Sequence, residues 1–329
     1  MVKLSIIILN FNDQHFLPEC LDSLEKQTLK DFEIILVDNG SDYHSHLELI
    51  KILNQYKNNL TIKLVQSKYN LFFAGGNNKG LKYTGGKYIC LLNNDTVVNS
   101  DFVKTSIKCM ESLTSFGFMS PRINFYDDKK KPRFWGSRIT PFSLDFITPL
   151  KKVYLNEIKE SGHAAGAALF TSKETINKLG QLDEIFFIYY EEVDWCTRAK
   201  KRYGLNNYYY PGTVVFHKEV STKTEKYYNY YLHLRNYQIF VWKNYSLIII
   251  LTFYLFHYPY YLIKSYIAAI YRFKFKRFLI IPRAAIMGLI IGVRRRSNRG
   301  CKKYMGKDYR YLKNLVKNNI RFLGFYFKG

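Results

Sequence analysis

The chain has 329 residues, of which 47% are hydrophobic, and this excludes a disordered chain and suits two domains or one large domain with an appendage. Its formal net charge of +24 is uneven, because residues 218–329 carry +20 and the first 217 residues carry +4. A basic, aromatic C-terminal third is typical of a protein that binds an anionic membrane surface, and nucleic acid is the competing partner.

Strands and helices alternate over the first hundred residues. The opening run MVKLSIIILNFN is too short for a signal peptide and lacks a cleavage site, so it predicts a buried strand in a cytosolic part of the protein. Apolar, β-branched runs predict four strands, at 4–9, 32–37, 62–65 and 88–92. Helical spacing predicts helices at 16–26, 47–56 and 74–84. This alternation predicts a parallel α/β sheet, in which ligands bind beyond the carboxyl ends of the strands.

The second half of the chain is less regular. Residues 121–160 contain Lys and Pro and predict a variable loop. Further strands are expected at 164–170 and 208–216, and helices at 174–179 and 193–203, the last of which stops at Gly204. From residue 227 onwards predicted strands no longer alternate with helices, and only helices are expected.

Polar clusters follow several of the predicted strands. Asp38, in VDNGS, could accept hydrogen bonds from a nucleoside, or it could cap the next helix. Asp95, in Asn93-Asn94-Asp95, could hold Mg²⁺ or Mn²⁺ and share it with a diphosphate, or it could belong to a simple turn. His217 could be a second metal ligand, although a lone histidine is more often structural.

The segment NLFFAGGNN at 70–78 joins two glycines to several amides at a predicted helix start. Gly75 and Gly76 could let the backbone approach a phosphate, and the alternative is close packing of the helix on the sheet. The spacing of the glycines fits neither a Walker loop nor a dinucleotide fingerprint.

Three carboxylates crowd together in FFIYYEEVDWCTR, namely Glu191, Glu192 and Asp194. Carboxylates beside apolar rings have raised proton affinity, which suits a general base for a weakly acidic hydroxyl. The alternative is a helix N-terminus, where acidic residues complement the helix dipole and Asp194 pairs with Arg198 one turn later.

Two stretches of the C-terminal third are apolar. Residues 246–263 carry no formal charge, but their many aromatic rings suit the headgroup region of a membrane better than its centre. Residues 278–293 are interrupted by Pro282 and Arg283. We expect residues 221–329 to form amphipathic helices on the inner face of the cell membrane, with a spanning helix and a helical subdomain or dimer contact as alternatives.

Five cysteines lie far apart and form no CxxC pair. They are Cys20, Cys90, Cys109, Cys196 and Cys301. Their spacing indicates neither a zinc site nor a disulfide framework, and reduced thiols in the cytosol are expected.

In their order and spacing these segments resemble the inverting family-2 glycosyltransferases of the GT-A fold, in particular the rhamnosyltransferase-like branch that builds bacterial surface polysaccharides. The likeness covers residues 3–243. It is carried by SIIILNFN at 5–12, VDNGS at 37–41, NLFFAGGNN at 70–78, LLNNDT at 91–96, GHAAGAALF at 162–170, FFIYYEEVDWCTRAKKRYG at 186–204, YYPGTVVFH at 209–217 and the RN of LHLRNYQIF at 232–240. It implies an α/β fold with a mostly parallel central sheet in a catalytic domain at 1–220, and a helical, basic extension at 221–329. The nucleotide-sugar half would be residues 1–97 and the acceptor half residues 98–220.

The resemblance also implies roles for the candidate residues. Asp38 would bind the uridine or thymidine moiety, and Asp95 and His217 would bind the metal. Glu192 would stand where the family has its catalytic Asp, with Glu191 as the alternative base. The other candidates for contacts with the donor are Asn10, Asn12, Asn70, Gly75, Gly76, Asn77 and Asn94.

The implied reaction is a single inverting displacement on a nucleotide sugar, either dTDP-rhamnose or a UDP-hexose. Mg²⁺ or Mn²⁺ would be the cofactor, and a saccharide or a polyprenyl-diphosphate-linked saccharide would be the acceptor. The sequence leaves the oligomeric state of the protein open. The sequence departs from the family twice, since Asn93 replaces the first acid of the metal motif and Glu192 replaces an Asp. The extra methylene of Glu192 moves its carboxylate by about one bond length, and errors of position near 1 Å are costly.

Two other functions would explain parts of the sequence. A nucleotidyltransferase would need a Gly-rich loop with Arg and Lys after the first strand, whereas the loop NFNDQHF contains no Lys or Arg. A membrane- or nucleic-acid-binding protein without catalysis would explain the charge of the C-terminal third. It would leave Asp38, Asp95 and the acidic cluster at 191–194 unexplained.

Overall fold

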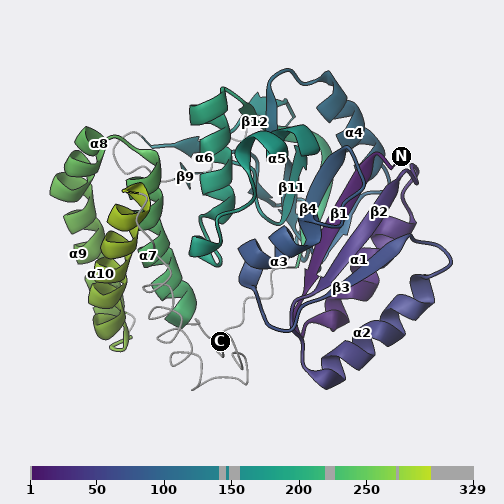
Figure 1. The fold of residues 1–329 in the computed structure, drawn as a ribbon, viewed down its shortest axis with the longest axis horizontal. Coiled ribbons are helices and arrows are strands. Elements are labelled where there is room, and N and C mark those ends of the chain that lie inside the picture. Colours follow the sequence, from purple (N-terminus) through teal and green to yellow (C-terminus); the bar gives the residue numbers. More distant parts are fainter. Residues whose placement is uncertain (1, 141–145, 148–155, 219–226, 272–273, 298–329) are drawn as a thin grey trace. The chain divides into compact units, whose positions relative to one another are not determined.

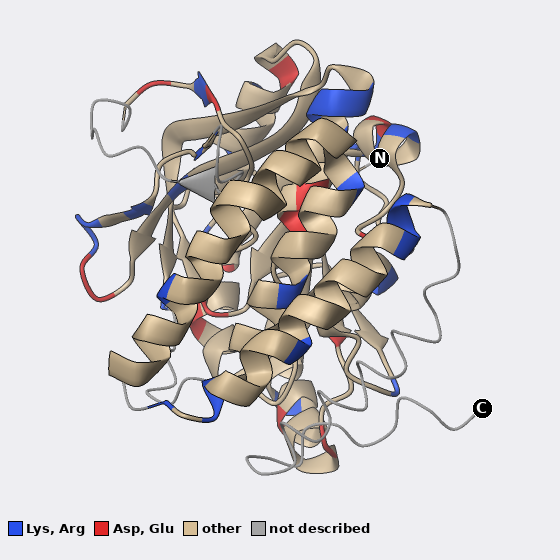
Figure 2. Cartoon of the chain, turned by 90° about the vertical axis from the view of Figure 1, so that its left-hand side faces the viewer, with Lys and Arg blue, Asp and Glu red and all other residues tan. Residues whose placement is uncertain are grey.

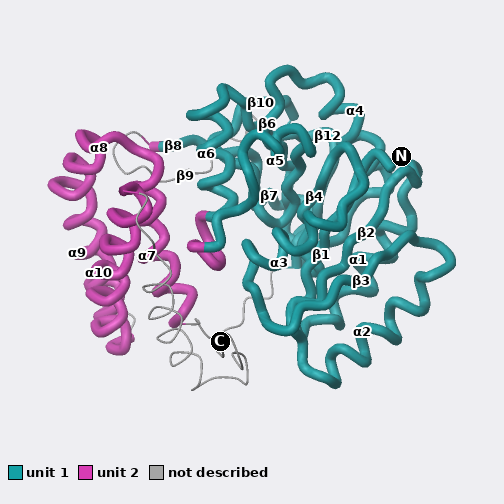
Figure 3. Tube along the Cα trace, in the orientation of Figure 1, with its two compact units in different colours: residues 1–139, 146–184, 191–220 teal, residues 140–145, 185–190, 221–329 magenta. Residues whose placement is uncertain are grey.

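The computed structural model describes residues 2–140, 146–147, 156–218, 227–271 and 274–297 (Figure 1). The chain divides into two compact units (Figure 3). The α/β unit comprises residues 1–139, 146–184 and 191–220, and the helical unit comprises residues 140–145, 185–190 and 221–329. The short segment 185–190 thus groups with the helices that follow the α/β unit.

A ten-stranded mixed sheet forms the centre of the α/β unit, with eight strands in the order β10-β12-β6-β11-β4-β1-β2-β3. Its N-terminal strands are parallel neighbours, and β11 runs antiparallel to both β4 and β6. The strands on this path are β1 (Leu4–Asn10), β2 (Phe32–Asp38), β3 (Ile62–Gln66), β4 (Tyr88–Asn93), β6 (Phe116–Phe125), β10 (Lys159–Glu160), β11 (Ala168–Ser172) and β12 (Asn206–His217). The short strands β5 (Thr96–Val98) and β7 (Pro132–Phe134) pair with β12 and β6, and β8 (Arg138–Ile139) pairs with β9 (Phe146–Ile147).

Helices cover both faces of this sheet. They are α1 (Leu17–Glu25), α2 (Tyr43–Tyr56), α3 (Phe72–Leu81), α4 (Phe102–Ser112), α5 (Lys173–Leu179) and α6 (Glu191–Tyr203). Alternate residues of each strand point to opposite faces, so Ile6 and Ile8 pack in the core with α1, α2 and α4, while Ile7 packs in the core with α3 and α6. Because the strands are buried on both faces, their sequences are continuous runs of apolar, mostly β-branched residues.

The predicted strands and helices of residues 4–97 are all present, with ends that differ by a few residues. The prediction of a variable loop over 121–160 is wrong for its first five residues, which belong to β6, and for the short strands β7, β8, β9 and β10, which also lie in this range. Pro121 is tolerated in β6 because the neighbouring strand β12 changes register between Tyr210 and Val214, directly opposite Pro121. Residues 141–145 and 148–155 of this segment lie outside the described residues.

The described helices of the helical unit are α7 (Tyr227–Asn244), α8 (Leu247–Thr252), the π-helical turn η4 (Phe253–His257), α9 (Tyr258–Tyr271) and α10 (Arg277–Arg296). The helix α10 continues through Pro282, which interrupts the apolar run of its sequence but not the helix. A Cβ atom on Gly288 would lie 2.7 Å from the carbonyl oxygen of Arg235 on α7, and one on Gly292 would lie 2.8 Å from the side chain of Trp242. These two glycines therefore allow α10 and α7 to pack closely.

Candidate active site

The carboxyl ends of the N-terminal strands bring several of the predicted residues to one edge of the sheet. Asn10 ends β1 beside Asp38 at the end of β2, and Asn93 ends β4 on the other side of β1. The side chain of Asn94 donates to Asn10 Oδ1 at 3.3 Å, and Asn12 Oδ1 accepts from the backbone nitrogen of Asp42. The strand order alone accounts for this cluster, because parallel strands end at the same edge.

Asp38 is fully buried, and both of its carboxylate oxygens have partners. Oδ1 accepts from the backbone nitrogen of Ser41 at 3.1 Å, and Oδ2 lies 2.6 Å from Nδ1 of His46. The capping alternative does not hold for Asp38, because Asp42 caps α2 through the backbone nitrogen of Ser45. His46 was missed by the sequence reasoning, since no motif distinguishes it from the other histidines.

Asp95 and His217, which are far apart in sequence, meet in the structure. Asp95 Oδ1 lies 3.1 Å from Nε2 of His217, and Asn93 Nδ2 lies 3.4 Å from the same nitrogen. The contact follows from the pairing of β5 with β12, which places Thr96 opposite His217. The backbone nitrogen of Lys218 also donates to the carbonyl of Asp95 at 3.0 Å.

This pair of side chains fits a divalent cation that also has ligands from outside the protein. Carboxylate oxygen and imidazole nitrogen are both acceptable ligands for Mn²⁺. Nδ1 of His217 is buried and has no hydrogen-bond partner among the described residues. Within the described ranges there is no group of three or more His, Cys, Asp or Glu side chains that could hold a metal alone. The protein would therefore supply two ligands, and the remaining positions suit diphosphate and water.

The glycine-rich start of α3 is closely packed on the sheet. A Cβ atom on Gly76 would lie 3.0 Å from the side chains of Leu9 and Asn39, and one on Gly75 would lie 2.9 Å from Leu71. The side chain of Asn77 donates to the carbonyl of Phe73 in the same helix and is almost fully buried. These contacts correspond to the packing alternative for the segment 70–78.

The first backbone amides at this helix start are also occupied. The amide of Leu71 donates to Asn39 Oδ1 at 2.9 Å, and that of Phe72 donates to Asn70 Oδ1 at 2.7 Å. A phosphate at this terminus would have to displace these side chains.

The acidic cluster forms the first turn of α6. Burial raises the pKa of Glu191 well above its usual range, and the neighbouring charge of Glu192 raises it further. Burial likewise raises the pKa of Glu192. Oε2 of each glutamate is buried without a hydrogen-bond partner among the residues that the structure describes. Both carboxylates therefore have the raised proton affinity that a general base for a hydroxyl needs.

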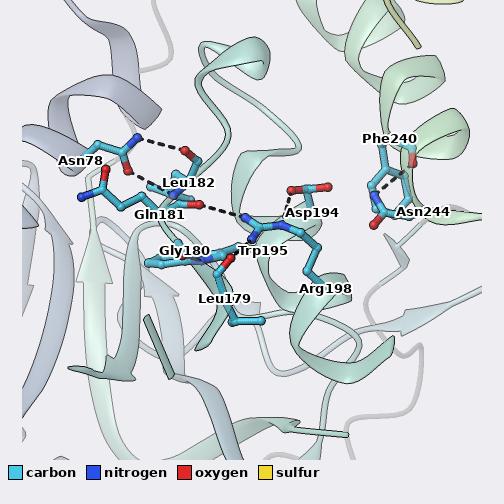
Figure 4. Close-up of polar contacts among 10 residues, drawn as sticks. All are labelled: Asn78, Leu179, Gly180, Gln181, Leu182, Asp194, Trp195, Arg198, Phe240 and Asn244. Atoms are coloured by element: carbon cyan, nitrogen blue, oxygen red, sulfur yellow. Dashed lines mark hydrogen bonds and ion pairs between the residues drawn. The ribbon is translucent and has the colours of Figure 1, made fainter. Parts of the chain in front are cut away.

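Asp194 differs from the two glutamates in having an arginine partner, and Figure 4 shows its pairing with Arg198. Its Oδ2 accepts from Nε of Arg198 at 2.9 Å. Arg198 in turn donates to the carbonyls of Leu179 and Gln181, at 2.7 and 3.0 Å. The predicted pairing of Asp194 with Arg198 is confirmed, and its effect is to fasten α6 to the end of α5.

The segment before β11 lies near the acidic cluster and near Asn93 within the α/β unit. A Cβ atom on Gly166 would lie 3.9 Å from the carboxyl carbon of Glu192. The next residue, Ala167, accepts a hydrogen bond from the backbone nitrogen of Asn93 at 3.0 Å. Asn93 in turn contacts His217. The segment 166–167 thus lies near the carboxylate of Glu192 and is hydrogen-bonded to Asn93, which contacts His217.

An unusual backbone segment precedes Glu191. Phe187, Tyr189 and Tyr190 have φ angles of +64°, +72° and +72°, in the left-handed region that residues with side chains rarely adopt. Each such residue costs roughly 1–2 kcal/mol. The sequence reasoning did not foresee this conformation, because three aromatic residues carry no signal for left-handed backbone.

The known proteins that this chain resembles are glycosyltransferases. Residues 5–172, just over half of the chain, match the family model described as Glycosyl transferase family 2. The low-salt glycan biosynthesis hexosyltransferase Agl10 of Haloferax volcanii is 26% identical over 242 residues, which cover 71% of this chain and 73% of that protein. The amylovoran biosynthesis glycosyltransferase AmsB of Erwinia amylovora is 26% identical over 208 residues, which cover 61% and 64% of the two chains.

Solved structures show the same fold. GalNAc-T7 with UDP, GalNAc and Mn²⁺ superposes with a TM-score of 0.59 at 18% identity, over 73% of this chain and 48% of that one. TarS 1–349 of S. aureus superposes with a TM-score of 0.56 at 14% identity, over 98% of this chain and 93% of that one. The expected GT-A fold with a helical C-terminal region is confirmed. From the family match and this fold together, the chain belongs to the family-2 glycosyltransferases.

Proposed function

We propose that the protein is an inverting glycosyltransferase of glycan biosynthesis that transfers a sugar from a nucleotide diphosphate to a saccharide or lipid-linked acceptor. The observation that carries the proposal is the contact of Asp95 with His217 in the same α/β unit as Glu192, whose pKa is raised and whose carboxylate lies near Gly166. The names of Agl10 and AmsB, which refer to glycan and amylovoran biosynthesis, favour a glycan product. A rhamnose donor remains the first candidate, with UDP-hexoses as the alternatives.

In this proposal the donor lies across the carboxyl ends of β1, β2 and β4. Asp38 would contact the nucleoside by exchanging one of its present partners, Ser41 or His46. The other proposed donor contacts at these strand ends are Asn10, Asn12, Asn70 and Asn94. Asp95 and His217 would hold Mg²⁺ or Mn²⁺, and a bound cation would offset the negative charge on the leaving diphosphate. Gly75, Gly76 and Asn77 are weaker donor contacts, because their surroundings are already filled by the protein.

Glu192 acts as the general base. Its carboxylate takes the proton of an acceptor hydroxyl, whose oxygen then attacks the anomeric carbon on the face opposite the leaving diphosphate. The bond from sugar to acceptor forms as the bond from sugar to diphosphate breaks, so the configuration of the sugar inverts in one step. Burial supplies the proton affinity that this role requires.

A screen of nucleotide sugars tests this function. The full-length protein is incubated with dTDP-rhamnose or a UDP-hexose, with Mg²⁺, Mn²⁺ or EDTA, and release of nucleoside diphosphate is measured. We expect release with one donor class, and loss of that release in EDTA. No release from any nucleotide sugar, with or without added saccharides, would contradict the proposal.

The Glu191→Gln variant is expected to retain transfer with an unchanged dependence on pH. Because the base must be deprotonated, activity is lost as the pH falls through the raised pKa of Glu192. The charge of Glu192 raises the pKa of Glu191, but Glu191 is still protonated and uncharged when Glu192 titrates, so a neutral glutamine at position 191 leaves the pKa of Glu192 in place. The acidic limb of kcat against pH should therefore stay where it is in the wild type. An inactive Glu191→Gln variant would instead make Glu191 the base.

We also propose that the helical unit binds an anionic membrane surface. Residues 227–297 contain eleven Lys and Arg and no Asp or Glu, and the long helices nearest the viewer in Figure 2 are tan with a few blue positions. Among the described residues, the continuous helical stretch Leu247–Tyr271 is the one long and apolar enough to cross a membrane, and only 17% of its most apolar window is buried.

The exposed apolar residues of this stretch recur at helical spacing. Ile248, Leu251 and Leu255 lie on one side of α8 and η4, and Ile263, Ile267 and Ile270 continue the spacing along α9. Leu279 on α10 is 78% exposed. An exposed apolar stripe with basic and no acidic neighbours suits a bilayer surface rich in anionic lipid.

Vesicle binding tests the membrane proposal. The triple variant Ile248→Ser, Phe256→Ser and Leu279→Ser removes three exposed apolar side chains and should weaken binding to anionic vesicles at least about tenfold, since each insertion is worth roughly 1.5–3 kcal/mol. Tyr43→Ser on α2, which is similarly exposed, is the matched control. Equal binding by the triple variant would contradict the proposal, and resistance to carbonate extraction would indicate a span.

A further inference from the structure

The loop 185–190, which leads directly into Glu191, is held by α7. Both belong to the helical unit. Asn236 Nδ2 donates to the carbonyls of Phe186, Ile188 and Tyr189, at 2.7, 2.9 and 2.8 Å. The two N–H groups of one amide thus serve three carbonyl oxygens of a six-residue loop, one N–H being shared between two of them.

Arg235 adds further hydrogen bonds to the loop and to Asn236. Its Nη1 donates to the carbonyl of Ile185 at 2.9 Å and also to Oδ1 of Asn236, which orients the amide toward the loop. Both side chains are fully buried. Buried polar groups of this kind are costly unless their hydrogen bonds are made, so the arrangement specifies one loop conformation.

The side chains of the loop pack on the same helix. The ring of Tyr190 lies 5.3 Å from that of His233 and 5.8 Å from that of Tyr237, measured between ring centroids. Tyr189 and Tyr190 are also two of the three residues of this loop whose φ angles lie in the left-handed region. Such backbone persists only where its surroundings determine it, and here α7 supplies those surroundings.

We propose that Arg235 and Asn236 are positioning residues for sugar transfer, because they fix the loop and thereby the start of α6. The inference rests on the proposed role of Glu192 as the base. Tyr190 is bonded to Glu191, so a change in the φ angle of Tyr189 or Tyr190 redirects the chain just before the two glutamates. Misplacement of a reacting group by about 1 Å can lower a rate by roughly 10²-fold.

The test compares Asn236→Ala with Asn244→Ala. Asn244 lies two turns further along α7, and its amide donates to the carbonyl of Phe240 in the same helix (Figure 4). Asn236→Ala is expected to lower kcat about 10- to 100-fold while leaving the KM for the donor unchanged, because the donor residues lie at the strand ends. Asn236→Asp, which keeps the size but loses the donor, should behave in the same way. Asn244→Ala should match the wild type in both constants.

Hydrogen–deuterium exchange gives a second readout that needs no substrate. Asn236→Ala should speed exchange of the amides of residues 186–192, with unchanged exchange in β1, β2 and β4. A fall in kcat without faster exchange, faster exchange without a fall in kcat, or no change in either would each overturn the proposal. A wild-type protein that transfers no sugar would refute the proposed function. Unchanged exchange of the amides of residues 186–192 in Asn236→Ala would instead refute the proposal that α7 fixes the loop.

Discussion

The Glu192→Gln variant is expected to lose sugar transfer by about 10³-fold, within the range typical for loss of a general base. Glutamine keeps the size of the side chain but has no carboxylate to take the proton of the acceptor hydroxyl. Affinity for the donor should be unchanged, because the proposed donor residues lie at the ends of β1, β2 and β4. Initial rates of transfer and calorimetric titration with the nucleotide sugar measure the two properties separately.

The Glu192→Asp variant, compared with Glu192→Gln, tests how much the position of the carboxylate matters. It restores the residue that the family usually carries and moves the carboxylate back by about one bond length, so partial activity is expected. The control Asp194→Asn removes a carboxylate from the same helical turn, but it breaks the ion pair with Arg198 and should lower stability more than kcat. Normal transfer by Glu192→Gln would remove this residue from the chemistry.

Asp95→Asn is expected to have the second largest effect. It removes the one carboxylate of the proposed metal pair and leaves His217, so the concentration of Mn²⁺ needed for half-maximal activity should rise by about 10- to 100-fold or more. The converse change, Asn93→Asp, adds a carboxylate beside His217 and should lower that concentration. Activity is measured as a function of free Mn²⁺ and Mg²⁺.

Glu111→Gln is the matched control for the metal prediction. Glu111 lies on the surface at the end of α4, where it pairs with Lys3 at 3.5 Å. Its loss should leave the dependence on metal unchanged. If Asp95→Asn also responded to Mn²⁺ as the wild type does, Asp95 would not be a ligand.

Much of the fold could be predicted because the strands of the first half are buried on both faces. Runs such as SIIIL and FEIILV have no other common explanation than a central strand, and they predicted β1 and β2 correctly. The strand β6 was missed because Pro121 and Arg122 interrupt its apolar pattern. Its place in the sheet depends on a register change in β12, which is a long-range feature that local pattern does not encode.

The candidate site shows the same division between local and long-range information. The pairing of Asp194 with Arg198 was predictable, since residues four apart on a helix are neighbours. The meeting of Asp95 with His217 depends on the pairing of β5 with β12, and it was expected from the family resemblance rather than from spacing. The hydrogen bonds from Asn236 to the loop 185–190 join two segments that are far apart in the sequence, and the type of residue alone does not predict such bonds.

The competing functions fit the molecule less well. The family match makes the chain a glycosyltransferase, so a purely membrane- or nucleic-acid-binding protein and a nucleotidyltransferase are no longer needed to explain it. The basic charge that motivated the binding protein is concentrated in the helical unit, where it is consistent with a membrane surface. The two properties can therefore belong to one enzyme that acts on a membrane-bound acceptor.

The anomeric configuration of the released or transferred sugar tests the central claim most directly. With the donor identified by the screen, the first-formed product is followed by proton NMR before it can equilibrate. A single displacement with Glu192 as base predicts that the product has the configuration opposite to that in the donor, and that Glu192→Gln does not form it. Retention of configuration, or the same inverted product formed at the wild-type rate by Glu192→Gln, would contradict the account.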